Sequence, residues 1–362
     1  MSREIFSDLK KFYEEKNMIE VLAEHIADIL KDYRQDEGLN PKKENVLNWI
    51  VQFSEENRLL ILEEMIHIFK QRYLLEKEVD KFLEGLISNT NLTKNNPNFW
   101  DEVSLLQIQK NGKSQELMNV KFKQIVKEEK NIDISINDLT KKHFIHLDDF
   151  LFTGNRLKTD LIDWLKTVPK DSSLDIIYIA YYKNGQYHVK QELDKNNQNN
   201  IKIKFWKLAE LENNPNCQNV SEVLWPNEKC LTNSDVLAYL KTQGTNYKLR
   251  DTNQIANAHC GKSIFSSETN RAILEKEFTL AGLNIISKIN EMDRKKWKPL
   301  GISSFPGFGF GALLFSYRNC PNNTPLAFWW GDWNGNSTWY PLFQRKTYQK
   351  QLPTVIFNWD IK

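Results

Sequence analysis

Apolar residues recur at intervals of three or four along the first 92 residues of the chain. This spacing places apolar side chains on one face of a helix, so it predicts a series of amphipathic helices. The pattern continues from Glu76 to Ile87 and is broken by the Asn- and Pro-containing stretch 89–97. We therefore expect a helical region over residues 1–92, either a bundle that caps the next domain or a module that binds a partner. The periodic positions are Val46, Trp49, Ile50, Phe53, Leu59, Leu62, Ile66 and Phe69.

Short apolar runs alternate with helical patterns over residues 93–225. Strand and helix in alternation predict a parallel sheet with right-handed crossovers, and the stretch Asp194–Asn200 is expected to be a surface loop. Functional sites in such sheets lie at the carboxyl ends of the strands. The expected strands are 103–108, 143–147, 174–182 and 201–206, with helices after the first two, near Leu117 and Leu157.

The pattern changes again over residues 226–362. Residues 232–292 are mainly of helical character, and a Gly/Phe/Pro-rich loop follows at 301–311. Two apolar runs, 313–317 and 326–330, flank an Asn-Asn-Thr-Pro sequence that is typical of a turn, which predicts a pair of strands joined as a hairpin. We expect a C-terminal helix-plus-hairpin region that supplies either an acceptor site or a partner surface.

Two adjacent acids, Asp148 and Asp149, end the apolar run that begins at His143. Thr153-Gly154-Asn155-Arg156 follows after a three-residue spacer, and an amphipathic helix begins near Leu157. Carboxylates at the carboxyl edge of a sheet can hold ribose hydroxyls, and the N-terminus of a helix offers backbone N–H groups to a phosphate. The alternative is an acidic surface turn, but adjacent unpaired carboxylates there need water, a cation or a hydroxyl partner.

This segment resembles the ribose-phosphate signature of the type I phosphoribosyltransferases. The run Phe144, Ile145 and Leu147, interrupted by His146, is followed by two acids, a three-residue spacer and the Thr-Gly loop, and the spacing matches without a gap. One position departs: purine-type members usually have an acid before Thr-Gly, where this chain has Phe152, so a purine acceptor activated in that way is doubtful. The C-terminal stretches GALLFSYRNCPNNTPLAFWW and WYPLFQR resemble a phosphoribosyltransferase-like family of bacterial conflict (anti-phage) systems.

The resemblance implies an α/β fold with a parallel-sheet phosphoribosyltransferase-like core, a helical N-terminal region and an α+β C-terminal region. Asp148 and Asp149 would hold the ribose hydroxyls and Mg²⁺, and the segment 153–157 the 5-phosphate. The implied function is that of a defence effector, a pentosyltransferase that binds phosphoribosyl pyrophosphate or a related nucleotide and transfers or cleaves at ribose C1. Its implied partner is an ATPase or a reverse transcriptase. The phosphate-binding residues would be Thr153, Gly154, Asn155, Arg156 and Leu157.

A second loop, 109–114, has the position of the family's pyrophosphate loop. Gly112 would let the backbone approach a ligand, Lys110 or Lys113 would supply charge, and Ser114 is a candidate N-cap. An ordinary polar turn between strand and helix explains the same residues. The alternative function is a non-catalytic module that senses a nucleotide or sugar phosphate and regulates a partner protein.

Charge and composition narrow the other possibilities. The net charge of +2 favours neither nucleic acid nor acidic partners, and the basic run 294–298 is either a solvated face or a contact for nucleic acid. No run approaches 18 apolar residues, so a membrane span is not expected. Four widely spaced cysteines indicate reduced thiols of a cytoplasmic protein.

Several polar and aromatic residues remain as candidates. The histidines lack metal-type spacing and are better explained as structural residues. Five C-terminal residues are candidates to line an acceptor pocket, although an aromatic core explains the region better. The histidines are His143, His146 and His259, and the acceptor candidates are Arg318, Asn319, Asn323, Trp330 and Arg345.

Overall fold

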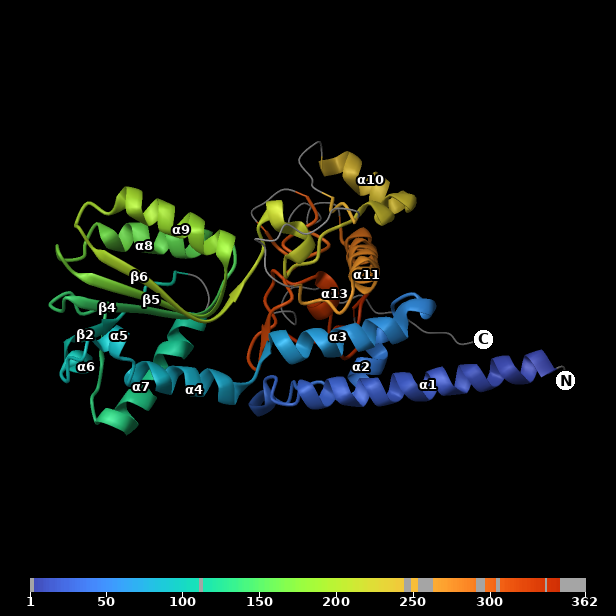
Figure 1. Ribbon diagram of the computed structural model, residues 1–362, viewed down its shortest axis with the longest axis horizontal. Helices are drawn as coiled ribbons and strands as arrows, with labels where there is room; N and C mark the ends of the chain where they lie inside the picture. Colours follow the sequence, from blue (N-terminus) through green and yellow to red (C-terminus); the bar gives the residue numbers. More distant parts are fainter. Residues whose placement is uncertain are drawn as a thin grey trace. The chain divides into compact units, whose positions relative to one another are not determined.

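The computed structural model describes residues 3–110, 113–243, 249–252, 263–290, 297–303, 307–335 and 337–345, with side chains from Glu14 onward (Figure 1). The chain divides into two compact units. Unit 1 consists of Met1–Glu76 and Pro215–Lys362, and unit 2 consists of Lys77–Asn214. The sequence suggested three consecutive regions, whereas in the structure the N-terminal helices and the C-terminal region share one unit.

Unit 2 is built on a five-stranded parallel sheet of order β3-β2-β4-β5-β6. The predicted α/β fold with a parallel sheet is confirmed. The strands are β2 (Val103–Leu105), β3 (Ser135–Ile136), β4 (His143–Leu151), β5 (Ser173–Tyr182) and β6 (Lys202–Leu211). The helices are α4 (Glu76–Ile87), α5 (Thr90–Thr93), α6 (Phe99–Glu102), α7 (Ser114–Lys130), α8 (Asn155–Leu165) and α9 (Lys183–Asn196).

The direction of chain progress through this sheet reverses between β2 and β4. From β2 the chain moves outward to β3, then returns to β4 and continues through β5 to β6 in the opposite direction. Right-handed crossovers then require α7 to cover one face and α8 and α9 the other, as Figure 1 shows. Loops at such a switch point leave a crevice at the carboxyl ends of the two strands, where ligands bind in α/β sheets.

Two strands are longer than predicted. The acids Asp148 and Asp149 lie inside β4, which continues to Leu151, because Asp148 pairs with Tyr178 and Phe150 pairs with Ala180 of β5. Likewise β6 extends to Leu211. Helix α9 reaches Asn196, so only the end of the predicted loop 194–200 is a loop.

The core of unit 2 on the α8–α9 side is apolar and aromatic. Phe144 of β4 and Trp164 of α8 are buried, and their rings meet edge to face with centroids 5.1 Å apart. Leu161 of α8 and Leu174 of β5 are fully buried in the same cluster. Burial of an aromatic or leucine side chain stabilises a fold by about 1.5–3 kcal/mol, so this cluster fixes α8 on the sheet.

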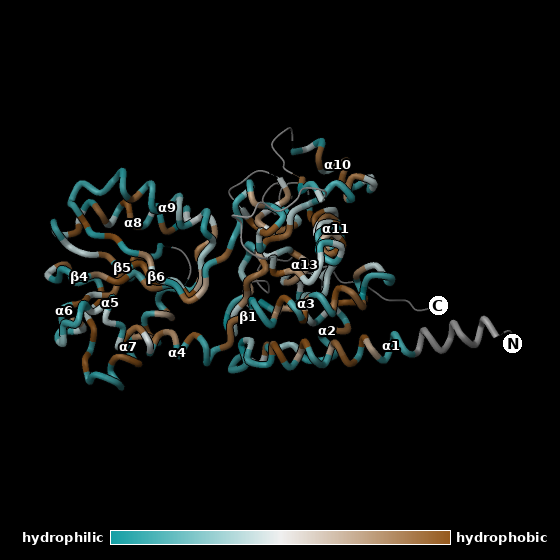
Figure 2. Tube along the Cα trace, viewed as in Figure 1, coloured by the Kyte–Doolittle hydropathy of each residue, from teal (hydrophilic) through white to brown (hydrophobic). Residues whose placement is uncertain are grey.

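Unit 1 is mainly helical. In Figure 2, α2 and the part of α1 from Glu14 onward alternate between hydrophobic and hydrophilic residues, as expected of amphipathic helices. Its helices are α1 (Arg3–Ile29), α2 (Lys43–Ile50), α3 (Arg58–Arg72), α10 (Ser234–Gln243), α11 (Glu268–Ser287) and α13 (Leu326–Trp329). Its core combines rings from both chain segments: Trp49, Phe69, Phe315, Phe328 and Phe343.

The predicted C-terminal hairpin is wrong. Residues 326–329 form helix α13, whose N–H groups donate within the turn, from Phe328 to Pro325 and from Trp330 to Leu326. Because these N–H groups are used within the helix, they do not form strand hydrogen bonds with residues 313–317. Instead, the short strand β7 (Phe315–Ser316) pairs in parallel with β1 (Tyr73–Leu74).

A buried ionic cluster in unit 1 links α11 to residues 218, 219 and 250 of the same unit. Glu275 accepts hydrogen bonds from Arg250 Nε at 2.9 Å and from Arg271 Nε at 3.0 Å, and none of the three side chains is solvent-exposed. Arg271 also donates to the backbone oxygens of Gln218 and Asn219, each at 2.7 Å. A buried carboxylate shared by two guanidinium groups satisfies charges that would be costly if unpaired.

The cysteines only partly match the expectation of four reduced thiols. Cys230 and Cys320 are free and buried. Cys217 is disulfide-bonded, so the prediction is wrong for that residue. Cys260 lies outside the described residues.

Among the described helices, none combines the length and apolar character needed to cross a membrane.

Candidate functional site

The paired acids are held in the middle strand of the unit 2 sheet. Asp148 and Asp149 are each 7% exposed. The Asp148 carboxylate accepts the N–H of Asp149 at 2.9 Å, and the Asp149 carboxylate accepts the N–H of Phe150 at 2.7 Å. These backbone donors fix both carboxylates at the carboxyl end of β4, where the sequence places them.

The Thr-Gly loop that follows is shaped by glycine. Gly154 is the N-cap of α8 with φ of +75°, and a Cβ atom there would lie 2.2 Å from Cγ2 of Val189. On the other side of this contact, a Cβ on Gly185 of α9 would lie 1.7 Å from the Phe152 oxygen. Only glycine fits at either position, so α9 sets the path of the loop. The sequence analysis did not identify Gly185. The feature that could have pointed to it is a glycine close to the start of a predicted helix, where glycine is otherwise unfavourable.

The first turn of α8 presents the predicted phosphate-binding groups. Asn155, Arg156 and Leu157 are its first three residues, and their N–H groups have no partner within the helix. The Leu157 side chain is buried in the core, so this residue can contribute only its backbone. Thr153 is half-buried, and Asn155 and Arg156 are exposed. The arrangement is a helix N-terminus open to an anion.

The loop after β2 lies beside the acids. Gln109 Nε2 donates to Asp148 Oδ2 at 3.4 Å. The buried Gln115 of α7 holds this loop, because its Oε1 accepts the N–H groups of Ile108 and Gln109, each at 2.9 Å. The structure thus brings the two loops of the switch point together. It does so through two glutamines: Gln109 belongs to the predicted loop 109–114 but had no role assigned to it, and Gln115 follows that loop directly.

The predicted pyrophosphate-binding residues are only partly placed as expected. Lys110 Nζ lies 2.6 Å from Asp163 of α8, and this pair is about half exposed. The ammonium groups of Lys110 and Lys166 lower the pKa of Asp163 to about 2. Lys113 is exposed and is itself the N-cap of α7, so the prediction of Ser114 as N-cap is wrong.

Gly112 lies outside the described residues, as does Asn111 beside it.

Two further buried groups surround the acids. Tyr178 pairs with Asp148 across the strands and is 2% exposed. Burial raises its pKa well above the ordinary value, and the negative charges of Asp148 and Asp149 raise it further. Burial also raises the pKa of Asp160 on α8, against the opposing charges of Lys110 and Arg156. Arg156 therefore acts electrostatically on the site as well as facing solvent.

The histidines behave as structural residues. His146 is 3% exposed, its Nδ1 has no hydrogen-bond partner within the described residues, and burial lowers its pKa to about 4. It is therefore neutral at pH 7. His143 Nδ1 lies 2.7 Å from Ser173 Oγ, a contact between neighbouring strands. His259 is outside the described residues.

The C-terminal acceptor candidates serve mainly as structure. Trp330 is 6% exposed in the unit 1 core, and the Arg345 guanidinium lies 4.7 Å from the centre of the Trp329 ring. Asn323 Nδ2 donates to the Ile302 oxygen at 2.7 Å. Arg318 and Asn319 are half-buried residues of the turn after β7. The preferred sequence interpretation, an aromatic core, agrees with these contacts.

Asp148 and Asp149 suit a metal site in which the protein supplies only some of the ligands and a bound phosphate and water supply the rest. Among the described residues no group of three or more His, Cys, Asp or Glu side chains converges on one point. Two carboxylates are nevertheless a donor set that Mg²⁺ uses when phosphates and water complete its octahedron. The residues therefore fit a cation that arrives with a phosphorylated ligand.

Comparison with known proteins identifies a family. The model of the family PRTase-CE, a family of phosphoribosyltransferase-like domains, matches residues 46–345 and so includes residues of both units. No curated protein matches the chain.

Proposed function

The chain belongs to the PRTase-CE family, and from this premise we propose that unit 2 binds phosphoribosyl pyrophosphate or a related nucleotide with Mg²⁺. One observation carries the proposal: two buried adjacent carboxylates lie in the same strand–loop–helix segment as an open helix N-terminus, at the switch point of a parallel sheet. A sugar bearing hydroxyls and a 5-phosphate matches these two surfaces.

Each part of the ligand has a distinct binding surface. Asp148 and Asp149 accept hydrogen bonds from the ribose 2- and 3-hydroxyls, and their fixed position costs little reorganisation on binding. The N–H groups of residues 154–157 and the Thr153 hydroxyl bind the 5-phosphate. Lys110 and Lys113 attract the pyrophosphate, for which Lys110 exchanges its exposed partner Asp163.

The reaction proposed is substitution at ribose C1. The bond from C1 to the pyrophosphate oxygen breaks, the pyrophosphate leaves with the bonding electrons, and an acceptor or water forms the new bond to C1. Mg²⁺, when bound with the ligand, neutralises charge on the pyrophosphate. The buried carboxylates lie near the positive charge that develops on the ring, which favours the transition state electrostatically.

The identity of Phe152 favours a second candidate function. Its ring lies near those of Phe150 and Tyr182, with centroids 6.1 and 5.7 Å away, so the position directly before Thr-Gly holds an aromatic core residue and no acid that could act on a base. A fold that retains the donor site without this acid suits a module that senses a nucleotide or sugar phosphate and regulates a partner. Turnover of the bound donor separates the two functions.

The biological setting is also part of the proposal. We propose an effector in anti-phage defence, with a partner ATPase or reverse transcriptase, on the basis of the sequence resemblance alone. Co-purification of the tagged chain from cells challenged with phage tests the partner. Recovery of the chain without either class of protein would contradict it.

The ligand site is tested by calorimetric titration with phosphoribosyl pyrophosphate and MgCl₂. We expect the wild type to bind and the variant Asp148→Asn/Asp149→Asn to lose binding while keeping its melting temperature. Asp194→Asn, an exposed acid of α9 in the same unit, is the matched control and should bind as the wild type does. No binding by the folded wild type would overturn the proposal.

Turnover is then measured as release of pyrophosphate from the bound donor. Release that the double variant lacks supports the enzyme, whereas tight binding without release supports the sensing module. Because binding and release are measured separately, a failure of one hypothesis is not confused with a failure of the other.

A further inference from the structure

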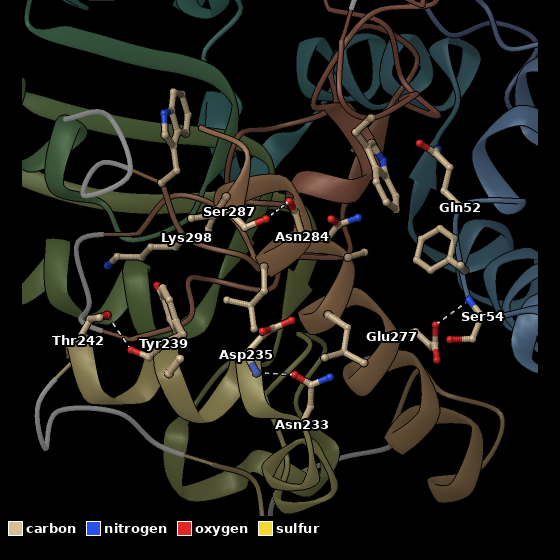
Figure 3. Close-up of a pocket in the computed structure, with 18 of the residues that line it drawn as sticks. Gln52, Ser54, Asn233, Asp235, Tyr239, Thr242, Glu277, Asn284, Ser287 and Lys298 are labelled. Atoms are coloured by element: carbon tan, nitrogen blue, oxygen red, sulfur yellow. Dashed lines mark hydrogen bonds between the residues drawn. The ribbon is translucent and has the colours of Figure 1, made fainter. Parts of the chain in front are cut away.

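Unit 1 contains a pocket of about 940 Å³ that shares no residue with the candidate site in unit 2. Residues 52–54, helices α10 and α11, residues 297 and 298, and Trp339 line it (Figure 3). This volume is at the upper end of the range of small-molecule sites. The family match spans these residues, but the proposed chemistry does not use this pocket.

Much of the pocket wall is apolar and aromatic. Helix α11 contributes Leu280 and Ala281, and α10 contributes the exposed Ala238. Such a surface favours a ligand with an apolar or aromatic body. Two of its rings, those of Tyr239 and Trp297, are half-buried and can attract a cation, whereas those of Phe53 and Trp339 are buried. The rings belong to Phe53, Tyr239, Trp297 and Trp339.

The charged groups of the pocket are predominantly acidic. Among the residues that line it, the carboxylates are Asp235 and Glu277 and the cation is Lys298. In Figure 3, Lys298 and Glu277 lie on opposite sides of the pocket, and Asp235 lies between them. Lys298 is already engaged, since its Nζ donates to the Ser303 oxygen at 2.8 Å, and burial lowers its pKa.

The two carboxylates differ in their availability. Glu277 is 4% exposed and accepts hydrogen bonds from Asn57 Nδ2 at 2.9 Å and from the Ser54 N–H at 3.3 Å. Asp235 is exposed at the pocket, and within the described part of the chain its carboxylate has no hydrogen bond or ion pair. The pocket thus presents an available carboxylate beside apolar walls.

We propose that this pocket binds a small organic ammonium compound with an aromatic or apolar body, whose cationic nitrogen pairs with Asp235. The aromatic rings cover the body of the ligand and stabilise its charge. Nucleotides and other polyanions are disfavoured, because the lining has two carboxylates and one engaged lysine. The N-terminus of α10 also lies in the lining, but Asn233 Oδ1 already accepts the N–H groups of Asp235 and Val236 there.

The test compares two probes of matched shape and opposite charge on the full chain. Tryptamine carries an ammonium group on an indole, and indole-3-propionate carries a carboxylate on the same ring. By calorimetry we expect tryptamine to bind at least about tenfold more tightly than indole-3-propionate. Equal or tighter binding of indole-3-propionate, or no binding of tryptamine, would overturn the proposal.

Two substitutions on α10 then locate the binding. Ala238→Trp fills the pocket and should weaken tryptamine binding by at least about tenfold. Leu237→Trp, at the neighbouring exposed position outside the lining, should leave binding unchanged. Melting temperatures of both variants show that the fold is retained. Wild-type affinity in a folded Ala238→Trp would refute this location.

Asp235→Asn removes the charge with almost no change of shape. We expect weaker tryptamine binding and unchanged, weak binding of indole-3-propionate. A variant that binds tryptamine as the wild type does would show that Asp235 is not the partner of the ammonium group. Phosphoribosyl pyrophosphate binding at the other site serves as an independent control of the same protein samples.

Discussion

The two units reach a packed core by different routes. Unit 2 is one continuous stretch, 77–214, and each of its strands pairs with a strand close in sequence. Unit 1 joins two stretches that unit 2 separates, so that Phe69 packs against Phe315 with ring centroids 5.2 Å apart. Local sequence patterns are consequently a good guide to unit 2 and a poor guide to the pairing in unit 1.

The units also differ in what their buried charges do. In unit 1, Glu275 pairs with both Arg250 and Arg271, and Glu268 also pairs with Arg250, so that cross-paired charges connect separate segments. In unit 2, the cationic Lys110 pairs at the surface, while Asp148 and Asp149 are buried at the end of a strand. Buried acids at the carboxyl end of a parallel strand are typical of sites that bind a ligand, whereas cross-paired charges are typical of structure.

The strongest test of the difference between the two units is to produce their segments as separate fragments. We expect residues 77–214 alone to fold cooperatively, because their core is local to the stretch. Residues 215–362 alone should not fold, because their core lacks Trp49 and Phe69. Circular dichroism and the dispersion of amide NMR signals measure both outcomes.

Addition of the fragment 1–76 to 215–362 is the control, and it should restore ordered structure. A cooperative unfolding transition of 215–362 by itself would contradict the idea that unit 1 depends on both of its segments.

The next largest effect is expected at the ionic cluster of unit 1. Glu275→Ala leaves Arg250 and Arg271 buried without their shared carboxylate, and we expect the unfolding free energy of unit 1 to fall by about 3–5 kcal/mol. Guanidinium denaturation followed by circular dichroism measures the loss. Glu192→Gln, which breaks the exposed pair with Lys195 on α9, should have no measurable effect on stability. Equal losses of stability in the two variants would contradict the idea that the buried cluster stabilises the protein more than an exposed ion pair does.

A smaller effect is expected at the Thr-Gly loop of unit 2. Gly154→Ala combines a positive φ with a close approach to Val189, and we expect a loss of about 2–3 kcal/mol. Gly38→Ala has a similar φ of +67° but open space around the added Cβ, so it should cost only about 1–2 kcal/mol. Urea denaturation measures both variants. Equal costs would show that α9 does not constrain the loop.

The smallest effect concerns pH and His146. Its pKa is lowered from 6.5 to about 4 in the folded protein, so the unfolded chain takes up its proton first as pH falls. Stability is therefore lost between about pH 6.5 and 4, by about 2 kcal/mol from pH 7 to pH 5. In urea denaturation of His146→Phe at both pH values, the difference in unfolding free energy between pH 7 and pH 5 should be smaller than in the wild type by that amount. An unchanged dependence would rule out His146 as the titrating group.

Much of the unit 2 fold and site was predictable because the determinants are local. The apolar run from His143, the two acids and the Thr-Gly loop occupy consecutive positions, and the strands and helices around them follow simple periodicities. The functional roles of Asp148, Asp149, Lys110 and Lys113 stay predictions. The glutamines Gln109 and Gln115 were not predictable, since their importance comes from a contact between two loops.

The sequence by itself determined the helical character of residues 43–87, the parallel α/β pattern of residues 103–211 and the spacing of the acids and the Thr-Gly loop. Only the tertiary structure decided that β7 pairs with β1, that Lys110 contacts Asp163, and that α10 and α11 line a pocket. The reason is physical. Periodicity is set by the backbone geometry of neighbouring residues, whereas these contacts depend on which distant apolar surfaces pack together.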